Sequence, residues 1–235
     1  QGQRYVWQKK RRGTPSRDFA PERFVCYLDN HDQVANSGSG ARIHQSTDRG
    51  RYKAMTALLL LQPQTPMLFQ GQEFGAGAPF VYFAHHTGEL AQLVEKGRRE
   101  FMEQFPSLKG LPIAPPHERA TLAMCVLDHT QRDAEIETMH RELLALRREM
   151  PPADALEAAT LSEECFVLRW FAEDDRLLIV NLGRDLHLEP APEPLLASLA
   201  GWRMVWATGH MPEPERDGVW DIPGHSAVLL KPVTA

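Results

Sequence analysis

Long hydrophobic runs, a surplus of basic charge and a recognisable cysteine pattern are all missing from this 235-residue sequence. The longest apolar candidate, Ala57–Leu61, is far shorter than the ~18–20 residues that a membrane helix needs. The net charge is −5, from 26 Lys and Arg against 31 Asp and Glu, whereas a nucleic-acid binder usually carries a basic surplus. We therefore expect neither a membrane nor a nucleic acid as a partner.

The sequence opens on Gln1, without a Met and without the apolar core of a signal peptide. We therefore expect a piece cut from a longer chain. The apolar content of 43% is that of an ordinary soluble globular protein, which has room for one domain or for two modest ones.

Three cysteines stand far apart in the sequence, at Cys26, Cys125 and Cys165. Their odd number and the lack of a C-x-x-C spacing predict neither a disulfide framework nor a structural zinc site. The neighbouring His31 and Asp32 likewise match no recognised metal-ligand spacing. We expect reduced thiols in a cytoplasmic protein that uses no metal and no cofactor.

Before residue 106, short apolar segments alternate with polar loops and helical patterns. Residues 24–28 predict a buried strand, and apolar residues at three- and four-residue steps predict a helix over about 48–61, with Asp48 as its N-cap. A second strand is expected at 67–69. An amphipathic helix follows, with these residues on one stripe: Leu90, Val94, Gly97, Phe101 and Phe105. Strands that alternate with helices in this way are typical of a parallel α/β arrangement.

After a proline-rich linker that starts at residue 106, the pattern changes. A helix is predicted over about 134–148, and strands are then expected at 165–171, 176–182, 202–208 and 227–230. These strands predict an all-antiparallel module, a small sandwich. We therefore divide the chain into an α/β part (1–105), a linker with a helix (106–158) and an all-β domain (159–235).

Polar side chains follow both strands of the α/β part, where the function of parallel α/β proteins gathers. The first strand runs into Asn30-His31-Asp32, and the second is followed by Gln72 and Glu73. Carboxylates, amides and nearby aromatic faces suit a neutral, hydroxyl-rich ligand, and no glycine-rich phosphate loop accompanies them. An Asn or Asp after a strand can equally serve as a helix N-cap, so Asn30 and Asp32 keep two interpretations.

The segment Phe24–Asn36 resembles a known enzyme family. Its Asn30-His31-Asp32 is similar to the fourth sequence region of the alpha-amylase family of glycoside hydrolases, and residues 30–36 resemble the malto-oligosyltrehalose trehalohydrolases within that family. The likeness continues, in the family's order, through residues 1–3, 65–74, 79–83, 142–148 and 223–227. It departs from the family at Ala35 and Ser37, where Gly and Arg are expected.

The resemblance implies a fold and a reaction. The two strands would be the last two of a (β/α)8 TIM barrel, and the final module would be the C-terminal β domain. The implied reaction is hydrolysis of the α-1,4-glucosidic bond next to the trehalose end of malto-oligosyltrehalose, which releases trehalose. Asp32 matches the carboxylate that stabilises the oxocarbenium-like transition state. The substrate contacts that we expect are His31, Gln33, Val34, Ala35, Asn36, Gln72 and Glu73.

The resemblance also implies that this stretch of chain is incomplete as a catalyst. Glycoside hydrolysis normally requires two carboxylates that flank the bond, and no segment resembles the family motifs that supply them. We therefore expect the chain to be inactive alone, and to need the missing barrel or self-association to cover its strand edges. Two alternatives stay open: another α-glucan hydrolase or transglycosylase of the same superfamily, or a non-catalytic carbohydrate-binding remnant.

Overall fold

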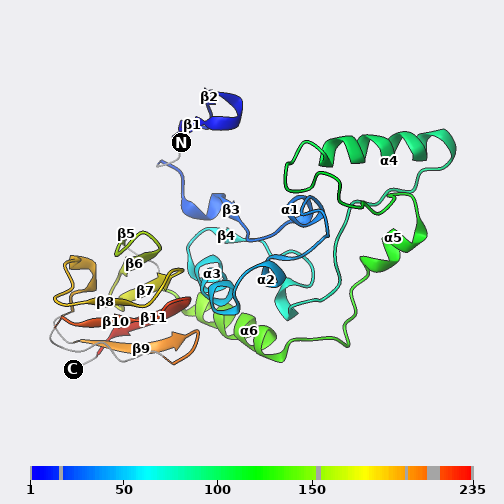
Figure 1. The fold of residues 1–235 in the computed structure, drawn as a ribbon. Helices are drawn as coiled ribbons and strands as arrows, with labels where there is room; N and C mark the ends of the chain where they lie inside the picture. The colour runs from blue at the N-terminus through cyan, green and yellow to red at the C-terminus, as the bar shows by residue number, and fades with distance from the viewer. Residues whose placement is uncertain (1, 16–17, 152–154, 199–200, 211–217, 234–235) are drawn as a thin grey trace.

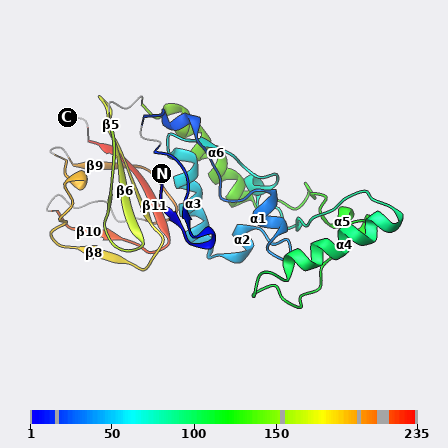
Figure 2. The same cartoon turned by 90° about the horizontal axis from the view of Figure 1, so that it is seen from above.

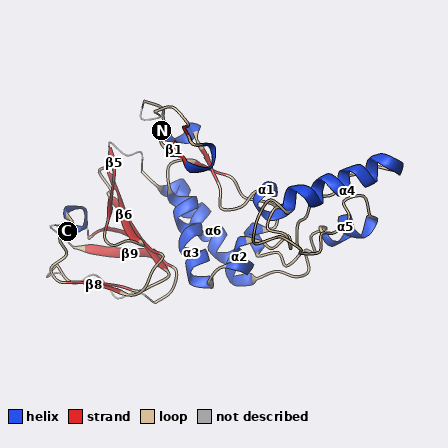
Figure 3. Ribbon diagram, turned by 45° about the horizontal axis from the view of Figure 1, so that its top comes forward, coloured by secondary structure: helices blue, strands red, loops and turns tan. Residues whose placement is uncertain are grey.

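The computed structural model describes residues 2–15, 18–151, 155–198, 201–210 and 218–233. Figure 1 shows a β module at one end, two packed helices beside it, and an arm of helices and loops on the far side. With the chain coloured by secondary structure, the long strands gather at one end, and the long helices lie beside them and in the arm, where loops connect them (Figure 3). No helix among the described residues is long and apolar enough to span a membrane.

The two strands of the α/β part pair in parallel, as predicted. They are β3 (Val25–Cys26) and β4 (Thr65–Pro66), and the Met67 backbone nitrogen extends the ladder by donating to the Cys26 carbonyl at 2.8 Å. The prediction of a buried strand over 24–28 is wrong, since Val25 is 57% exposed. The predicted bounds of the second strand, 67–69, are also wrong, because β4 ends at Pro66. Both errors have one cause: the described residues form only a two-stranded sheet here, so no further strand extends or covers the pair.

The helices predicted over 48–61 and 134–148 are confirmed. Helix α3 spans Arg49–Leu61 and begins at Asp48, whose carboxylate accepts a hydrogen bond from the Arg51 backbone nitrogen at 3.0 Å. Helix α6 spans Ala134–Glu149 and begins at Asp133, whose side chain caps the Glu135 and Ile136 nitrogens. A polar acceptor at the N-cap satisfies donors that the first turn leaves without a partner.

The β module is antiparallel throughout, as predicted. Its main sheet has the order β5-β6-β7-β11-β9, and a smaller sheet pairs β10 with β8. The strands are β5 (Ala155–Thr160), β6 (Cys165–Phe171), β7 (Arg176–Asn181), β8 (Leu186–Leu188), β9 (Trp202–Ala207), β10 (Trp220–Ile222) and β11 (Ser226–Pro232). The prediction located β6, β7, β9 and β11 and missed the others.

Two hydrophobic cores lie on opposite faces of the main sheet. One joins the sheet to α3 and α6 through fully buried residues such as Leu60, Leu143, Leu178 and Leu229. The other lies between the main sheet and the smaller one and includes Trp202, Trp220 and Ile222. Because the first core takes side chains from both halves of the sequence, the predicted boundary near residue 158 separates segments that pack together.

The arm contains α4 (Gly88–Met102) and α5 (Arg119–Met124), which lie away from the β module in Figures 1 and 2. Among the described residues, the predicted apolar stripe of α4 stays largely open: Leu90 is 53% exposed and Phe101 39%. Helix α4 instead buries Ala91 and Met102. The arm makes few contacts with the rest of the described chain. The apolar periodicity of α4 therefore did not predict which of its faces is buried.

Short elements connect these units. They are β1 (Arg4–Tyr5), η1 (Val6–Gln8), β2 (Lys10–Arg11), η2 (Pro21–Arg23), α1 (His31–Ala35), α2 (Ile43–Ser46), η3 (Gln72–Phe74) and η4 (Pro194–Leu196). The three cysteines form no disulfide, and Cys125 and Cys165 are buried. Burial raises the pKa of the Cys165 thiol to about 12, which makes it unreactive at neutral pH.

Candidate functional site

The turn after β3 is the short helix α1, and its cap decides which residues face solvent. The Asn30 side chain accepts hydrogen bonds from the backbone nitrogens of Asp32 at 2.8 Å and Gln33 at 3.2 Å, so Asn30 is an N-cap. This cap leaves His31 and Asp32 in the first turn with side chains 69% and 71% exposed, 3.5 Å apart between Nε2 and Oδ1. Of the two interpretations for these positions, capping holds for Asn30, while the Asp32 carboxylate is open to a ligand.

The remaining residues of α1 divide between the core and the surface. Val34 and Ala35 are 1% and 8% exposed, so they anchor the helix, while Gln33 is exposed. Asn36 follows α1 and accepts a hydrogen bond through Oδ1 from Arg98 Nη1 at 2.7 Å. Because it is buried, the Val34 side chain has a packing role here.

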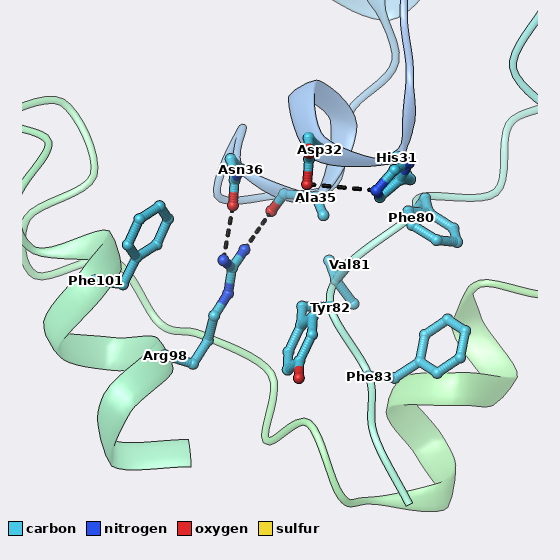
Figure 4. Close-up of a pocket in the computed structure, with 10 residues that line it drawn as sticks. All are labelled: His31, Asp32, Ala35, Asn36, Phe80, Val81, Tyr82, Phe83, Arg98 and Phe101. Atoms are coloured by element: carbon cyan, nitrogen blue, oxygen red, sulfur yellow. Dashed lines mark hydrogen bonds and ion pairs between the residues drawn. The ribbon is translucent and has the colours of Figure 1, made fainter. Parts of the chain in front are cut away.

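His31, Asp32, Ala35 and Asn36 line one side of a hollow of about 370 Å³. Its other walls come from the segment 80–83 and from α4, and they are mostly aromatic (Figure 4): Phe80, Tyr82, Phe83 and Phe101. A carboxylate, an imidazole and an amide thus face a set of aromatic rings across an open space. This combination suits a sugar, whose hydroxyls bind polar groups while its apolar ring faces pack on aromatic side chains.

Hydrogen bonds from the backbone hold the aromatic wall in place. The Phe80 nitrogen donates to the Gly40 carbonyl at 3.0 Å, and the Val81 nitrogen lies 3.4 Å from Cys125 Sγ. Gly40 has a φ of +75°, and a Cβ there would lie 2.8 Å from the Phe80 carbonyl oxygen. The loop between α1 and α2 and the aromatic wall can therefore approach this closely only with glycine at position 40.

Two buried charged residues, Arg42 and Asp29, support the same region from behind. Arg42 is 1% exposed and donates to the carbonyls of Ala78 at 2.8 Å and Gln70 at 2.6 Å. Burial lowers its pKa, an effect that the nearby Asp29 carboxylate opposes. Asp29 in turn accepts a hydrogen bond from the Ile43 nitrogen at 2.8 Å. These bonds tie the start of α2 to the segment that precedes the aromatic wall.

The second group of predicted contacts lies elsewhere. Gln72 is 2% exposed, and its Oε1 accepts a hydrogen bond from the Phe69 nitrogen at 3.3 Å. Glu73 is half-buried beside it in η3, and neither residue lines the hollow at Asp32. The structure therefore brings together His31, Asp32, Ala35 and Asn36, but it does not bring Gln72 or Glu73 to them.

Sequence reasoning assigned no role to Arg98 or to the aromatic wall. The run of aromatic residues at 80–83 was the one visible signal for the wall, whereas nothing local marks Arg98 among the basic residues of α4. No group of three or more His, Cys, Asp or Glu side chains among the described residues is arranged to hold a metal ion.

Curated relatives share most of this chain. Malto-oligosyltrehalose trehalohydrolase of Deinococcus radiodurans is 34% identical over 187 residues, which is 76% of this chain and 31% of the relative. The protein of that name from Rhizobium sp. strain M-11 is 31% identical over 221 residues, 90% of this chain and 35% of the relative. This chain thus spans about a third of the length of the relatives that it matches.

Solved structures and a family model agree with these relatives. A Salmonella typhimurium crystal structure assigned to the alpha amylases superposes with a TM-score of 0.79 at 26% identity, covering 98% of this chain and 39% of that one. An alpha-amylase from H. orenii shares the fold, with a TM-score of 0.53 at 14% identity over 89% of this chain and 40% of that one. Residues 153–229 match a domain of unknown function, DUF3459.

The fold and the relatives together define the class: the chain is similar to the alpha-amylase family of glycoside hydrolases, whose members among its structural neighbours are TIM-barrel proteins. Within that class, it is similar to the C-terminal portion of the malto-oligosyltrehalose trehalohydrolases. The resemblance predicted from residues 24–36 is confirmed.

Proposed function

We propose that this chain supplies the Asp32 side of the active site of a glycoside hydrolase that cleaves the α-1,4-glucosidic bond next to the trehalose end of malto-oligosyltrehalose. The observation that carries the proposal is the exposed Asp32 carboxylate, which follows β3 and faces a hollow with aromatic walls. The name shared by the curated relatives supplies the substrate class.

The position of Asp32 suits a carboxylate that stabilises positive charge in the transition state. Cleavage of a glycosidic bond builds positive charge on the sugar ring, and a carboxylate held near that charge stabilises it. Asp32 would also accept hydrogen bonds from ring hydroxyls, with His31 beside it at 3.5 Å. The aromatic rings across the hollow would then pack against the sugar face.

The nucleophile and the general acid belong to another part of the enzyme. Among the described residues, Asp32 is the one acidic side chain that lines the hollow, whereas glycoside hydrolysis normally uses a pair of carboxylates on either side of the bond. In this proposal the chain alone binds the sugar and does not turn it over.

Residues 1–105 would contribute the last two β/α units of a (β/α)8 barrel, with 106–158 as linker and helix and 159–235 as the C-terminal β domain. The parallel pairing of β3 and β4, with α3 between them in sequence, supports the first assignment. The exposed Val25 and the open edges of this pair support a covering partner, either the rest of the barrel or a second copy. The three free cysteines support the predicted cytoplasmic location.

A chimera tests the function. The chain is fused behind the part of the Deinococcus radiodurans relative that precedes the matched region, and trehalose release from maltotriosyltrehalose is measured. We expect turnover by the chimera, and a loss of several orders of magnitude in kcat when Asp32→Asn removes the charge. Near-normal turnover by the Asp32→Asn chimera would remove Asp32 from the mechanism.

The same assay separates the alternatives. Release of glucose or maltose from maltopentaose, without trehalose from maltotriosyltrehalose, would indicate another α-glucan hydrolase of the superfamily. Binding of maltopentaose by the chain together with no turnover by a folded chimera would favour the non-catalytic carbohydrate-binding remnant, which the single carboxylate in the hollow also fits.

A further inference from the structure

Arg98 of α4 connects three walls of the hollow at Asp32. Its Nη1 donates to Asn36 Oδ1 at 2.7 Å, and its Nη2 donates to the Ala35 carbonyl at 2.8 Å. The same guanidinium lies 5.5 Å from the centre of the Tyr82 ring and 5.6 Å from that of Phe101. Figure 4 shows Arg98 reaching from the helix on one side of the hollow to the end of α1.

These contacts fix the orientation of the Asn36 amide. A guanidinium carries only donors, so the amide must turn its oxygen toward Arg98. Its Nδ2 group then remains for a ligand, because Nδ2 donates no hydrogen bond to any residue that the structure describes. Sugar hydroxyl oxygens accept such bonds, so this orientation leaves a donor on the wall of the hollow that also contains the Asp32 carboxylate.

The environment of Arg98 also fixes its side chain, so that it can orient the Asn36 amide. The side chain is half-buried, and burial lowers its pKa while the charge of the Asp32 carboxylate opposes that shift. The planar guanidinium bonds two oxygens at once, and forming the second bond costs little additional side-chain entropy. A lysine ammonium cannot reproduce this two-pronged geometry.

We propose that Arg98 is a positioning residue for the sugar site: it holds the Asn36 amide and the end of α1 against the aromatic wall, so that Asn36 donates a hydrogen bond to a glucosyl hydroxyl beside Asp32. The inference rests on the proposed function, because it takes an α-glucan as the ligand. Arg98 itself acts through Asn36.

The neighbouring Arg99 provides a matched control. It lies on the same helix with its side chain 49% exposed, and it pairs only with Glu95 at 3.2 Å among the described residues. Arg98→Ala and Arg99→Ala therefore remove the same charge from α4, but only the first removes contacts with the hollow.

The experiment titrates maltotetraose into the 235-residue chain and follows backbone and side-chain amide signals by NMR. We expect Arg98→Ala to weaken sugar affinity about tenfold, the loss expected for charge-assisted hydrogen bonds that no longer hold their acceptors. Arg98→Lys should fall between Arg98→Ala and the parent, and Arg99→Ala should match the parent. Without sugar, the Asn36 side-chain NH2 signals should move in both Arg98 variants and stay in place in Arg99→Ala.

A double-mutant cycle distinguishes positioning from a general loss of structure. If Arg98 acts through Asn36, the Arg98→Lys/Asn36→Ala double variant should bind no more weakly than Asn36→Ala alone. Equal affinity of the parent and the Arg98 variants, or fully multiplicative losses in the cycle, would overturn the inference. Absence of any sugar binding by the unsubstituted chain would instead overturn the proposed function on which it rests.

Discussion

Arg49 and Asp133 form a bidentate ion pair between α3 and α6, with Nη1–Oδ2 at 2.7 Å and Nη2–Oδ1 at 2.9 Å. Asp133 is also the N-cap of α6, where Oδ1 accepts from the backbone nitrogens of Glu135 and Ile136 at 3.1 Å each. The Asp133 carboxylate therefore caps α6 and also links α6 to α3. Both helices contribute to the core that packs against the main sheet.

This double role predicts different costs for two substitutions of Asp133. Asp133→Ala removes the cap and the ion pair and should lower the free energy of unfolding by about 1–2 kcal/mol. Asp133→Asn keeps a capping oxygen and loses the charge, and its cost should stay below about 1 kcal/mol because the pair is partly exposed to solvent. Urea denaturation at neutral pH measures both, and equal stability of the two variants would contradict the assignment.

The same carboxylate predicts a pH dependence. The hydrogen bonds from Arg49 lower the pKa of Asp133 from 3.8 to about 2. A depressed pKa means that the folded state favours the charged form, so this stabilisation is present above pH 3.8 and is lost as the pH falls toward about 2. Unfolding measured between pH 5 and pH 2 should show a smaller loss of stability on acidification in Asp133→Asn than in the parent chain.

The backbone conformation of Gly40 predicts how the aromatic wall of the hollow responds to a substitution. Its φ of +75° and the Phe80 backbone oxygen at 2.8 Å from a built Cβ leave no room for alanine. Gly40→Ala should cost about 1–3 kcal/mol of stability and should shift the amide signals of the aromatic wall.

Gly97 of α4 is the control for Gly40. A Cβ at Gly97 would meet nothing within 4 Å, so Gly97→Ala should be neutral or stabilising by up to ~1 kcal/mol through helix propensity. Thermal unfolding of both variants checks the pair, and a stable Gly40→Ala with unshifted amides would contradict the close approach.

His187 joins the two strands of the smaller sheet in a pH-dependent way. Its Nδ1 lies 2.7 Å from Asp221 Oδ1 and its Nε2 lies 3.4 Å from Glu189 Oε2, and these carboxylates raise the pKa of the imidazole. A raised pKa means that the folded state favours the protonated form. The stabilisation is therefore present below the unfolded pKa near 6.5 and is lost as the pH rises through the folded value.

An NMR titration of the His187 ring protons measures this effect. The midpoint should lie above that of an exposed histidine, and it should fall toward the ordinary value in Asp221→Asn, which removes the stronger of the two contacts. An unchanged midpoint in that variant would show that Asp221 does not hold the imidazole.

Local signals in the sequence predicted much of this fold. Helices α3 and α6 were located from their apolar periods, with Asp48 as the predicted N-cap of α3, and the central strands of the β module were located as apolar runs between turns. The uncovered edges of the β3–β4 pair were expected from the missing barrel, whereas the apolar pattern of residues 24–28 wrongly predicted a buried strand, because burial depends on what lies beside an element in space. Periodicity identifies a face and says nothing about its partner.

The grouping of the candidate site residues has the same limit. Residues 30–36 are contiguous in sequence, so the motif by itself places His31, Asp32 and Asn36 close together, in and directly after α1. Arg98 is 62 residues from Asn36 in sequence, and it meets that residue only because the arm folds back toward α1. No spacing rule predicts such a contact.

The proposed function requires that the hollow beside His31 and Asp32 binds the end of an α-glucan. The most direct measurement is an NMR titration of the chain with maltotriosyltrehalose, repeated with Asp32→Ala. We expect the shifts to concentrate at residues 31–36 and 80–83 and the β-module signals to stay unchanged, and we expect Asp32→Ala to weaken the binding. Shifts confined to the β module, or the same binding curve for Asp32→Ala, would contradict the proposed function.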